Sequence, residues 1–328
     1  MDRRVKAAVV GVGFFGERHV RVYSELPNAQ LVAVVDADIS RAREIAARYG
    51  CEVETDVASL VGKIDVASIV TPTASHVKTA IPLLNAGIDL LIEKPITATL
   101  TEADEIIELA REKKRIVQVG HIERYNPALL QLKKYVTSPR VIECHRMGPF
   151  VERAANVSVI LDLMIHDIDI VLSMTKCAPI KVEAAGISVV SPETDIAHAR
   201  LFFADGMVAS LLASRASEER IRTLRLFQDQ GYFSLNYLTR ELTVFQERQR
   251  GDALPSRLND VTKGLGKDSH CPSQKYVFEQ ADMLKAEINA FIEAVMTRQV
   301  PAVSAVTGRA ALAVALQIID ALNAPTIQ

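Results

Sequence analysis

A glycine-rich turn that follows an apolar segment constrains the fold of this chain more than any other feature. Residues Val5 to Gly16 read VKAAVVGVGFFG, so an apolar run leads directly into the pattern Gly11-x-Gly13-x-x-Gly16. A second apolar run, Leu31 to Val35, ends at Asp36, 20 positions after Gly16. A strand, a tight glycine turn, a helix and a second strand that ends in an acid form the dinucleotide-binding unit of doubly wound α/β proteins.

Each glycine has its own expected role in that turn. Gly11 permits the tight turn, Gly13 lets the backbone approach a pyrophosphate, and Gly16 lets the following helix pack close to the strand. Phe14 and Phe15 complete the turn, and the helix presents free N–H groups to the phosphates. A glycine-rich turn in another α/β protein is the alternative, and the flanking strand, helix and acid favour dinucleotide binding.

Asp36 bears on the choice of cofactor. A carboxylate at the end of the second strand accepts hydrogen bonds from the ribose hydroxyls and repels a 2′-phosphate, so we expect NAD, with NADP disfavoured. Arg41 and Arg43 follow closely in the sequence. They keep NADP open as an alternative, because a nearby arginine can accommodate the 2′-phosphate.

Composition narrows the class of protein. A chain of 328 residues, 49% hydrophobic and 24% charged, suggests two domains, or one large domain, with a substantial core. The net charge of −2 argues against a general nucleic-acid binder, and no run of 18 apolar residues suggests a membrane span. Four widely spaced cysteines without a CxxC pair are typical of a reduced, cytoplasmic protein.

Up to about residue 120 the chain alternates short apolar strands with helical patterns. Strands are expected at 7–10, 31–35, 66–70, 90–92 and 116–119, and helices at 17–26, 40–49, 76–85 and 102–114. Gly87 has the place of a left-handed helix cap, and Thr99 with Glu102 has capping-box spacing. This alternation predicts an α/β Rossmann domain with a parallel sheet over residues 1–120.

The pattern changes after Gly120. A helix is expected at 156–175, followed by strands at 181–190, 197–203, 207–213, 223–228, 232–237 and 241–245. Turn signals between them predict an open, mostly antiparallel sheet. Residues 250–275 are expected to form a loop, and helices are expected at 282–297 and 306–322. We therefore predict a second, α+β domain over 121–328 for substrate binding and oligomerisation, with C-terminal helices able to pack back on the first.

Three further groups of residues carry chemistry. Thr71-Pro72-Thr73, with His76 just beyond, follows the third expected strand, and Glu93-Lys94-Pro95 follows the fourth. Loops at the carboxyl ends of parallel strands line the ligand crevice, which puts Lys94 near the nicotinamide. The alternatives are that Thr71-Pro72-Thr73 merely begins a helix and that Lys94 is merely exposed to solvent. The Lys94–Pro95 peptide is a candidate for a cis bond.

The third group is Asp162 and His166, in the segment ILDLMIHDIDIVL. Their i,i+4 spacing places both on one helix face, where the carboxylate can orient the imidazole and support its charged form. An ordinary helix with exposed polar residues is the alternative. A metal site made with Asp169 is not predicted, because the three do not share a narrow face.

These motifs, in this order and spacing, resemble the Gfo/Idh/MocA family of NAD(P)-dependent sugar oxidoreductases over nearly the whole chain. The resemblance implies a Rossmann domain followed by an α/β domain whose open sheet forms the subunit contact, and hence a homodimer or homotetramer. It also implies that Lys94, Asp162 and His166 are catalytic and contact the substrate. Glu93, Lys94 and His121 join the residues above as cofactor-binding candidates.

Two segments, 119–127 (VGHIERYNP) and 159–169 (VILDLMIHDID), carry a narrower similarity. They resemble dehydrogenases that oxidise the 3-hydroxyl of UDP-N-acetylglucosamine before a transamination that leads to 2,3-diamino sugars, as in some lipid A. Other members of the family act on the matching uronic acid nucleotide, on free sugars or on inositols. The expected partner is therefore a small nucleotide sugar, with no nucleic acid and no membrane.

The expected chemistry is hydride transfer from C3 of the sugar to NAD. His166, oriented by Asp162, takes the hydroxyl proton, while Lys94 stabilises charge on the same oxygen, and the two roles can be exchanged. Arg124 and Arg153 are candidates for the diphosphate, and Tyr125 and Asn126 for the sugar or uracil. An NAD-recycling glycoside hydrolase and a non-catalytic NAD-binding regulator are the rival functions.

Overall fold

The computed structural model describes residues 4–152, 155–175, 177–229, 231–246, 273–279 and 281–323. The chain divides into two compact units. The first contains Met1–Tyr125 and Asp282–Ala313, and the second contains Asn126–Ala281 and Val314–Gln328. The sequence predicts a boundary after residue 120, whereas residues 121–125 and 282–313 group with the first unit.

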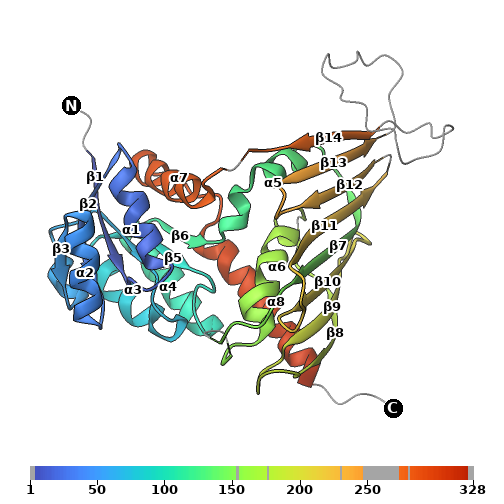
Figure 1. Cartoon of the computed structure of the whole chain (residues 1–328), viewed down its shortest axis with the longest axis horizontal. Coiled ribbons are helices and arrows are strands. Elements are labelled where there is room, and N and C mark those ends of the chain that lie inside the picture. Colours follow the sequence, from blue (N-terminus) through green and yellow to red (C-terminus); the bar gives the residue numbers. More distant parts are fainter. Residues whose placement is uncertain are drawn as a thin grey trace. The chain divides into compact units, whose positions relative to one another are not determined.

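The first unit is built on a parallel sheet with the strand order β3-β2-β1-β4-β5-β6 (Figure 1). The strands are β1 (Val5–Val10), β2 (Ala29–Val35), β3 (Glu52–Glu54), β4 (Val66–Ile69), β5 (Asp89–Glu93) and β6 (Val117–Gly120). Only β3 is missed by the sequence pattern, because it is three residues long and has no apolar run. The strand order reverses between β1 and β4, which is where such sheets bind ligands.

Four helices connect the strands of this sheet. They are α1 (Gly16–Glu25), α2 (Ile39–Tyr49), α3 (His76–Asn85) and α4 (Leu100–Lys113). All four were expected from the sequence. The capping box of Thr99 and Glu102 is present, and Gly87 has a φ of 81° after α3, as predicted.

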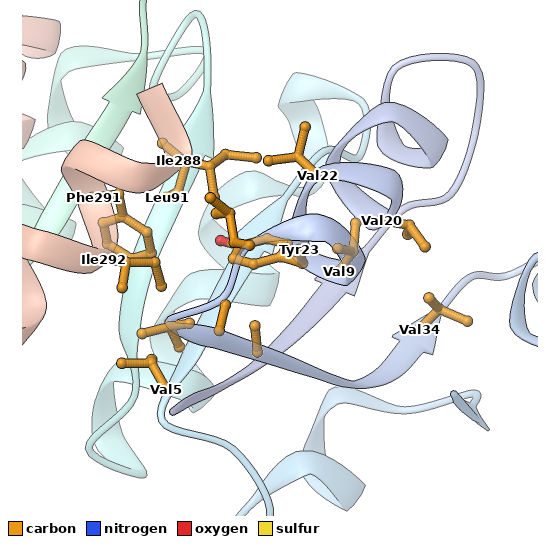
Figure 2. Packing of buried hydrophobic residues seen from close by; sticks show 14 of the residues in the cluster. Val5, Val9, Val20, Val22, Tyr23, Val34, Leu91, Ile288, Phe291 and Ile292 are labelled. Atoms are coloured by element: carbon orange, nitrogen blue, oxygen red, sulfur yellow. The ribbon is translucent and has the colours of Figure 1, made fainter. Parts of the chain in front are cut away.

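A hydrophobic core fixes α1, and with it the glycine turn. Figure 2 shows Val9 of β1 and Tyr23 of α1 packed with Ile288 and Phe291 of α7 (Met283–Thr297). Tyr23 is fully buried, and its hydroxyl lies 2.9 Å from Ser68 Oγ. Burial raises the pKa of Tyr23, which keeps this hydroxyl neutral inside the core.

The edge strand β6 is covered by a segment from the far end of the chain. Val119 N–H donates to Val303 O at 2.9 Å, and Gln118 forms a bridge with Ser304. Gly308 of α8 (Ala305–Asn323) packs so close that a Cβ would lie 2.5 Å from Val119 Cγ2. Residues 303–308 therefore cover this edge of the sheet and belong to the first unit.

The second unit contains an eight-stranded sheet in the order β14-β13-β12-β11-β7-β10-β9-β8 (Figure 1). Only β7 and β10 pair in parallel, so the sheet is mixed but mostly antiparallel, as predicted. The strands are β7 (Pro139–Met147), β8 (Lys181–Ile187), β9 (Ile196–Phe202), β10 (Val208–Ser214), β11 (Ile221–Gln228), β12 (Gly231–Asn236), β13 (Glu241–Gln246) and β14 (Ser273–Val277). The predicted loop 250–275 lies mostly outside the described residues, but its last three residues belong to β14.

One face of this sheet is covered by α5 (Pro127–Leu132) and α6 (Ile165–Leu172) (Figure 1). The residues Ile160–Met164 form one wide, π-helical turn directly before α6. The helix predicted at 156–175 is therefore shorter and interrupted. Such wide turns inside helices often occur at functional sites.

Within the described part of the chain, one helix, α8, is long and apolar enough to cross a membrane by length and composition alone. Its residues Ala311, Leu312, Ala315 and Ile318 are fully buried in the hydrophobic core. Burial of this kind is typical of a core helix in a globular protein.

Candidate active site

The glycine turn has the shape that a bound pyrophosphate requires. Gly11 has a φ of 87°, and a Cβ there would lie 2.7 Å from Val70 O. A Cβ on Gly16 would overlap the carbonyl of Gly11, whereas a Cβ on Gly13 would meet nothing within 4 Å. The open space beside Gly13, at the N-terminus of α1, fits the diphosphate of a dinucleotide.

Asp36 is held at the end of β2 against this turn. Its Oδ2 accepts a hydrogen bond from Val12 N–H at 2.7 Å, and its Oδ1 accepts one from Asp38 N–H at 2.9 Å. Each carboxylate oxygen has further acceptor capacity for a ribose hydroxyl. The residues around the turn therefore fit NAD.

Arg41 contacts the same residue of the turn as this carboxylate, Val12, and other acceptors hold its guanidinium. Its Nε donates to Val12 O at 3.2 Å, and its terminal nitrogens donate to Glu44 and Glu17. Arg43 is exposed on the same helix. The sequence could not show which acceptors surround Arg41.

The two aromatic residues of the turn have different environments. Phe14 is 61% exposed, and the guanidinium carbon of Arg18 lies 4.4 Å from its ring centroid. Phe15 packs its ring edge-on against His19 at 5.2 Å. Phe14 is therefore the more accessible of the two to a ligand.

The Thr71-Pro72-Thr73 loop follows β4, and Thr73 begins a short 3₁₀ turn before α3. His76 has a role that the sequence did not suggest. Its Nε2 lies 2.9 Å from Thr71 O, and its Nδ1 lies 3.1 Å from Pro95 O and from Ile96 O. The ring is 1% exposed. His76 therefore joins two site loops from within, and its contact with the cofactor stays a prediction.

Glu93 ends β5 and packs between neighbours within the first unit. His19 Nε2 lies 3.3 Å from Glu93 Oε1, and a Cβ on Gly120 would overlap the same carboxylate. His19 is fully buried. The sequence does not indicate its role, because the glycine motif places no requirement on this position. Lys94 follows, half-buried, and its peptide bond to Pro95 is cis, as anticipated.

The segment after β6 is divided between the units. His121 is buried, and Arg124 and Tyr125 are half-buried in a 3₁₀ turn of the first unit. Asn126 begins the second unit, where its Oδ1 caps α5 by accepting a hydrogen bond from Ala128 N–H at 3.0 Å. The contact of Asn126 with the substrate stays a prediction. Arg153 lies outside the described residues.

Asp162 and His166 lie in the second unit. Asp162 is in the π-helical turn and His166 in the first turn of α6, both half-buried. The next residue, Asp167, is buried and accepts two hydrogen bonds from Arg146 of β7, at 2.9 and 2.8 Å. This bidentate pair, which the sequence did not reveal, fixes α6 to the sheet and so fixes the backbone that carries His166.

The other ionisable clusters do not suggest a metal centre. Among the described residues, no group of three or more His, Cys, Asp or Glu side chains could hold a metal ion.

Two family models match this chain. Residues 5–121 match the model of the oxidoreductase family with an NAD-binding Rossmann fold, Gfo/Idh/MocA. Residues 130–234 match the Gfo/Idh/MocA C-terminal domain.

UDP-N-acetylglucosamine 3-dehydrogenase from Acidithiobacillus ferrooxidans is 34% identical over 324 residues, 98% of each chain. Its solved structure superimposes with a TM-score of 0.87, covering 97% of this chain and 98% of that one. Inositol 2-dehydrogenase 4 from Saccharopolyspora erythraea is 31% identical, over 51% of this chain and 53% of its own length. The chain belongs to the Gfo/Idh/MocA family of NAD-binding oxidoreductases.

Proposed function

We propose that this protein oxidises the 3-hydroxyl of UDP-N-acetylglucosamine to a ketone, with NAD as the cofactor. The observation that carries the proposal is the similarity, along nearly the full length, to a dehydrogenase named for this substrate. In sequence, the inositol dehydrogenases match about half of the chain, although the solved structure of one covers 98% of it at 21% identity. Lys94, Asp162 and His166 supply the chemical groups that the reaction needs.

NAD bound on the glycine turn supplies the hydride acceptor for C3 of the sugar. His166 takes the proton of the 3-hydroxyl, and Asp162 orients its imidazole and supports the charged form. Lys94 donates a hydrogen bond to the same oxygen and stabilises its developing negative charge. In the alternative assignment, Lys94 and His166 exchange these roles.

The diphosphate of the substrate needs cationic partners. Arg124 and Arg153 are the proposed partners, because a guanidinium matches phosphate geometry. Tyr125, next to Arg124, is proposed to contact the sugar or the uracil. If Arg124→Ala and Arg153→Ala both leave the KM for the substrate unchanged, this assignment is wrong.

The test is NADH formation by the purified protein with UDP-N-acetylglucosamine, its uronic acid form, UDP-glucose, free sugars and myo-inositol. The ketone is trapped with hydroxylamine, so that an unfavourable equilibrium does not hide turnover. Turnover restricted to UDP-N-acetylglucosamine supports the proposal. Turnover only with another sugar or with an inositol assigns a different substrate to the same chemistry.

The same assay separates two rival functions. A glycoside hydrolase that recycles NAD would release a cleaved sugar without net NADH. A non-catalytic regulator would bind NAD and turn over no substrate. The presence of Lys94, Asp162 and His166 together favours an enzyme over the regulator.

We also place this reaction in the cytoplasm, before an aminotransferase. A ketone at C3 is the group that a transamination converts to an amine, which gives a 2,3-diamino sugar of the kind found in some lipid A. Detection of the 3-amino product after addition of an aminotransferase and an amino donor would test this order of reactions.

For the oligomer, we propose a homodimer or homotetramer formed through the outer face of the second sheet. Val141, Phe227, Tyr232 and Phe245 form an apolar row across four strands, in register. The ring centroids of Phe227 and Tyr232 are 4.8 Å apart, and those of Tyr232 and Phe245 are 5.2 Å apart. Phe227 and Val141 are 37% and 39% exposed. A second copy would cover this row.

A parallel row of charged residues supports a second copy of the chain as the partner. Glu183, Arg200, Glu143 and Arg225 alternate in sign across β8, β9, β7 and β11, with Ser210 of β10 between Arg200 and Glu143. A row of alternating charges can pair with itself about a two-fold axis.

A further inference from the structure

Four charged side chains of α1 and α2 form a closed ring beside the glycine turn. Arg41 donates to Glu17 at 2.5 Å and to Glu44 at 2.8 Å. Arg48 donates to Glu44 at 2.7 Å and also to Glu17. Each carboxylate therefore bridges two guanidinium groups, and the two positive charges are matched by two negative charges.

This ring is attached to the end of the turn where a ribose binds. Arg41 Nε donates to the carbonyl of Val12, while the N–H of Val12 donates to Asp36. The guanidinium of Arg41 and the carboxylate of Asp36 therefore hold the same residue of the turn. In dinucleotide-binding folds, an arginine near this acid is the group that accommodates the 2′-phosphate of NADP.

We infer that Glu17 and Glu44 are specificity-determining residues, which hold Arg41 in the ring and so withhold it from a 2′-phosphate. Arg41 is held by three hydrogen bonds, one from Nε and one from each terminal nitrogen, and its charge is balanced by two carboxylates, so a phosphate must compete with Glu17 and Glu44 for the guanidinium. Asp36 repels the phosphate. Glu17 and Glu44 neutralise Arg41, the cation that could otherwise offset this repulsion. The inference concerns the cofactor and is independent of the sugar that the enzyme oxidises.

The test is the double variant Glu17→Gln/Glu44→Gln, with Asp36 intact. Glutamine keeps the shape of glutamate and can still accept a hydrogen bond, but it carries no charge, so it holds Arg41 more weakly and no longer balances the charge of the guanidinium. The dissociation constants of NADH and NADPH are measured by titration calorimetry. Glu17 lies in the first turn of α1, and loss of its charge changes the field at the pyrophosphate for both cofactors alike. The readout is therefore the dissociation constant of NADPH divided by that of NADH. We expect this ratio to fall about tenfold in the double variant.

Two further variants test whether the effect passes through Arg41. Adding Arg41→Gln to the double variant should return the ratio to the wild-type value. Glu25→Gln removes a carboxylate from the same helix, where it pairs with Arg21, and should leave the ratio unchanged. If either variant shows the tenfold fall in the ratio of dissociation constants, net charge explains the change and the inference is overturned.

An unchanged ratio in a folded double variant, judged by its melting temperature, also overturns the inference. If the double variant does not fold, Glu44→Gln alone serves, because the side chain of Glu44 is 52% exposed. Glu44→Gln alone should lower the ratio of dissociation constants by less than the double variant does. An unchanged ratio in this variant, if it is folded, overturns the inference.

Discussion

At the scale of single residues, Lys94 and His166 are the groups that we expect to handle the proton and the charge on the reacting oxygen. Lys94→Ala and His166→Asn should each lower kcat by about 10²–10⁴-fold, the usual contribution of a positioned acid or base. The dissociation constant of NADH should change little. Steady-state kinetics with UDP-N-acetylglucosamine and cofactor titrations measure both quantities. Wild-type turnover in both variants would reject the proposed roles.

The glycines of the turn give a matched pair of variants. Gly13→Ala adds a methyl group to open space, so the protein should keep its melting temperature but bind NADH more weakly. Gly16→Ala places a methyl group against the carbonyl of Gly11, so it should lower the stability of the first unit by about 1–3 kcal/mol. Calorimetry and thermal unfolding separate the two effects. Equal losses of stability would contradict the assignment of distinct roles.

The sequence predicts those residues that belong to a local pattern. The glycine turn, Asp36 and the cis bond at Lys94–Pro95 follow from short motifs, and the structure contains each of them. His19 and Arg146 were missed because their partners, Glu93 and Asp167, lie 74 and 21 positions away along the chain. The backbone contacts of His76 and the helix-capping role of Asn126 were missed, because a sequence does not show which backbone groups a polar side chain will bind.

At the scale of elements, the strand β7 shows why a regular pattern can fail. Its inward positions are Ile142, Cys144 and Arg146, and its outward positions include Glu143 and His145. An arginine at a core position breaks the alternation of apolar and polar residues that predicts a strand. The break is tolerated because Asp167 of α6 meets Arg146 in the core.

Asp195 ties the loop between β8 and β9 to other elements. Its side chain accepts hydrogen bonds from the backbone N–H groups of residues 189–191 and from Arg215 Nε at 2.7 Å. Arg215 in turn donates to Val157 O. The second unit should therefore lose about 3–5 kcal/mol in Asp195→Asn, because Arg215 is left buried without its counter-ion. Urea unfolding at pH 7 measures this loss.

The same variant has an expected dependence on pH. Burial raises the pKa of Asp195, but hydrogen bonds from Ser191, Arg215 and the backbone outweigh burial and hold it well below the usual 3.8. A depressed pKa in the folded state stabilises the protein above pH 3.8, and this stabilisation is lost as the pH falls further. The difference in the free energy of unfolding between wild type and Asp195→Asn should therefore become smaller below about pH 4. The control Asp205→Asn, in an exposed turn, should differ little from wild type in this free energy at every pH.

At the scale of the whole molecule, the apolar row of the second sheet predicts an effect on assembly. Phe227→Glu should convert the oligomer to monomers, because a carboxylate in the centre of the row loses its hydration when a second copy covers it. Light scattering after gel filtration measures the mass. Val300→Glu, at a residue 84% exposed in the first unit, is the matched control. A wild-type protein that is monomeric at micromolar concentration would contradict the proposal.

The path of the chain through the two units has a consequence for biosynthesis. Residues 282–313 supply α7 to the hydrophobic core under β1 and the segment that covers the edge strand β6. A ribosome makes the dinucleotide-binding strands well before these covering elements. The core of the first unit therefore cannot close until residues 282–313 have been translated. A fragment that ends at residue 125 should aggregate or need a chaperone, whereas the same residues are stable in the complete chain.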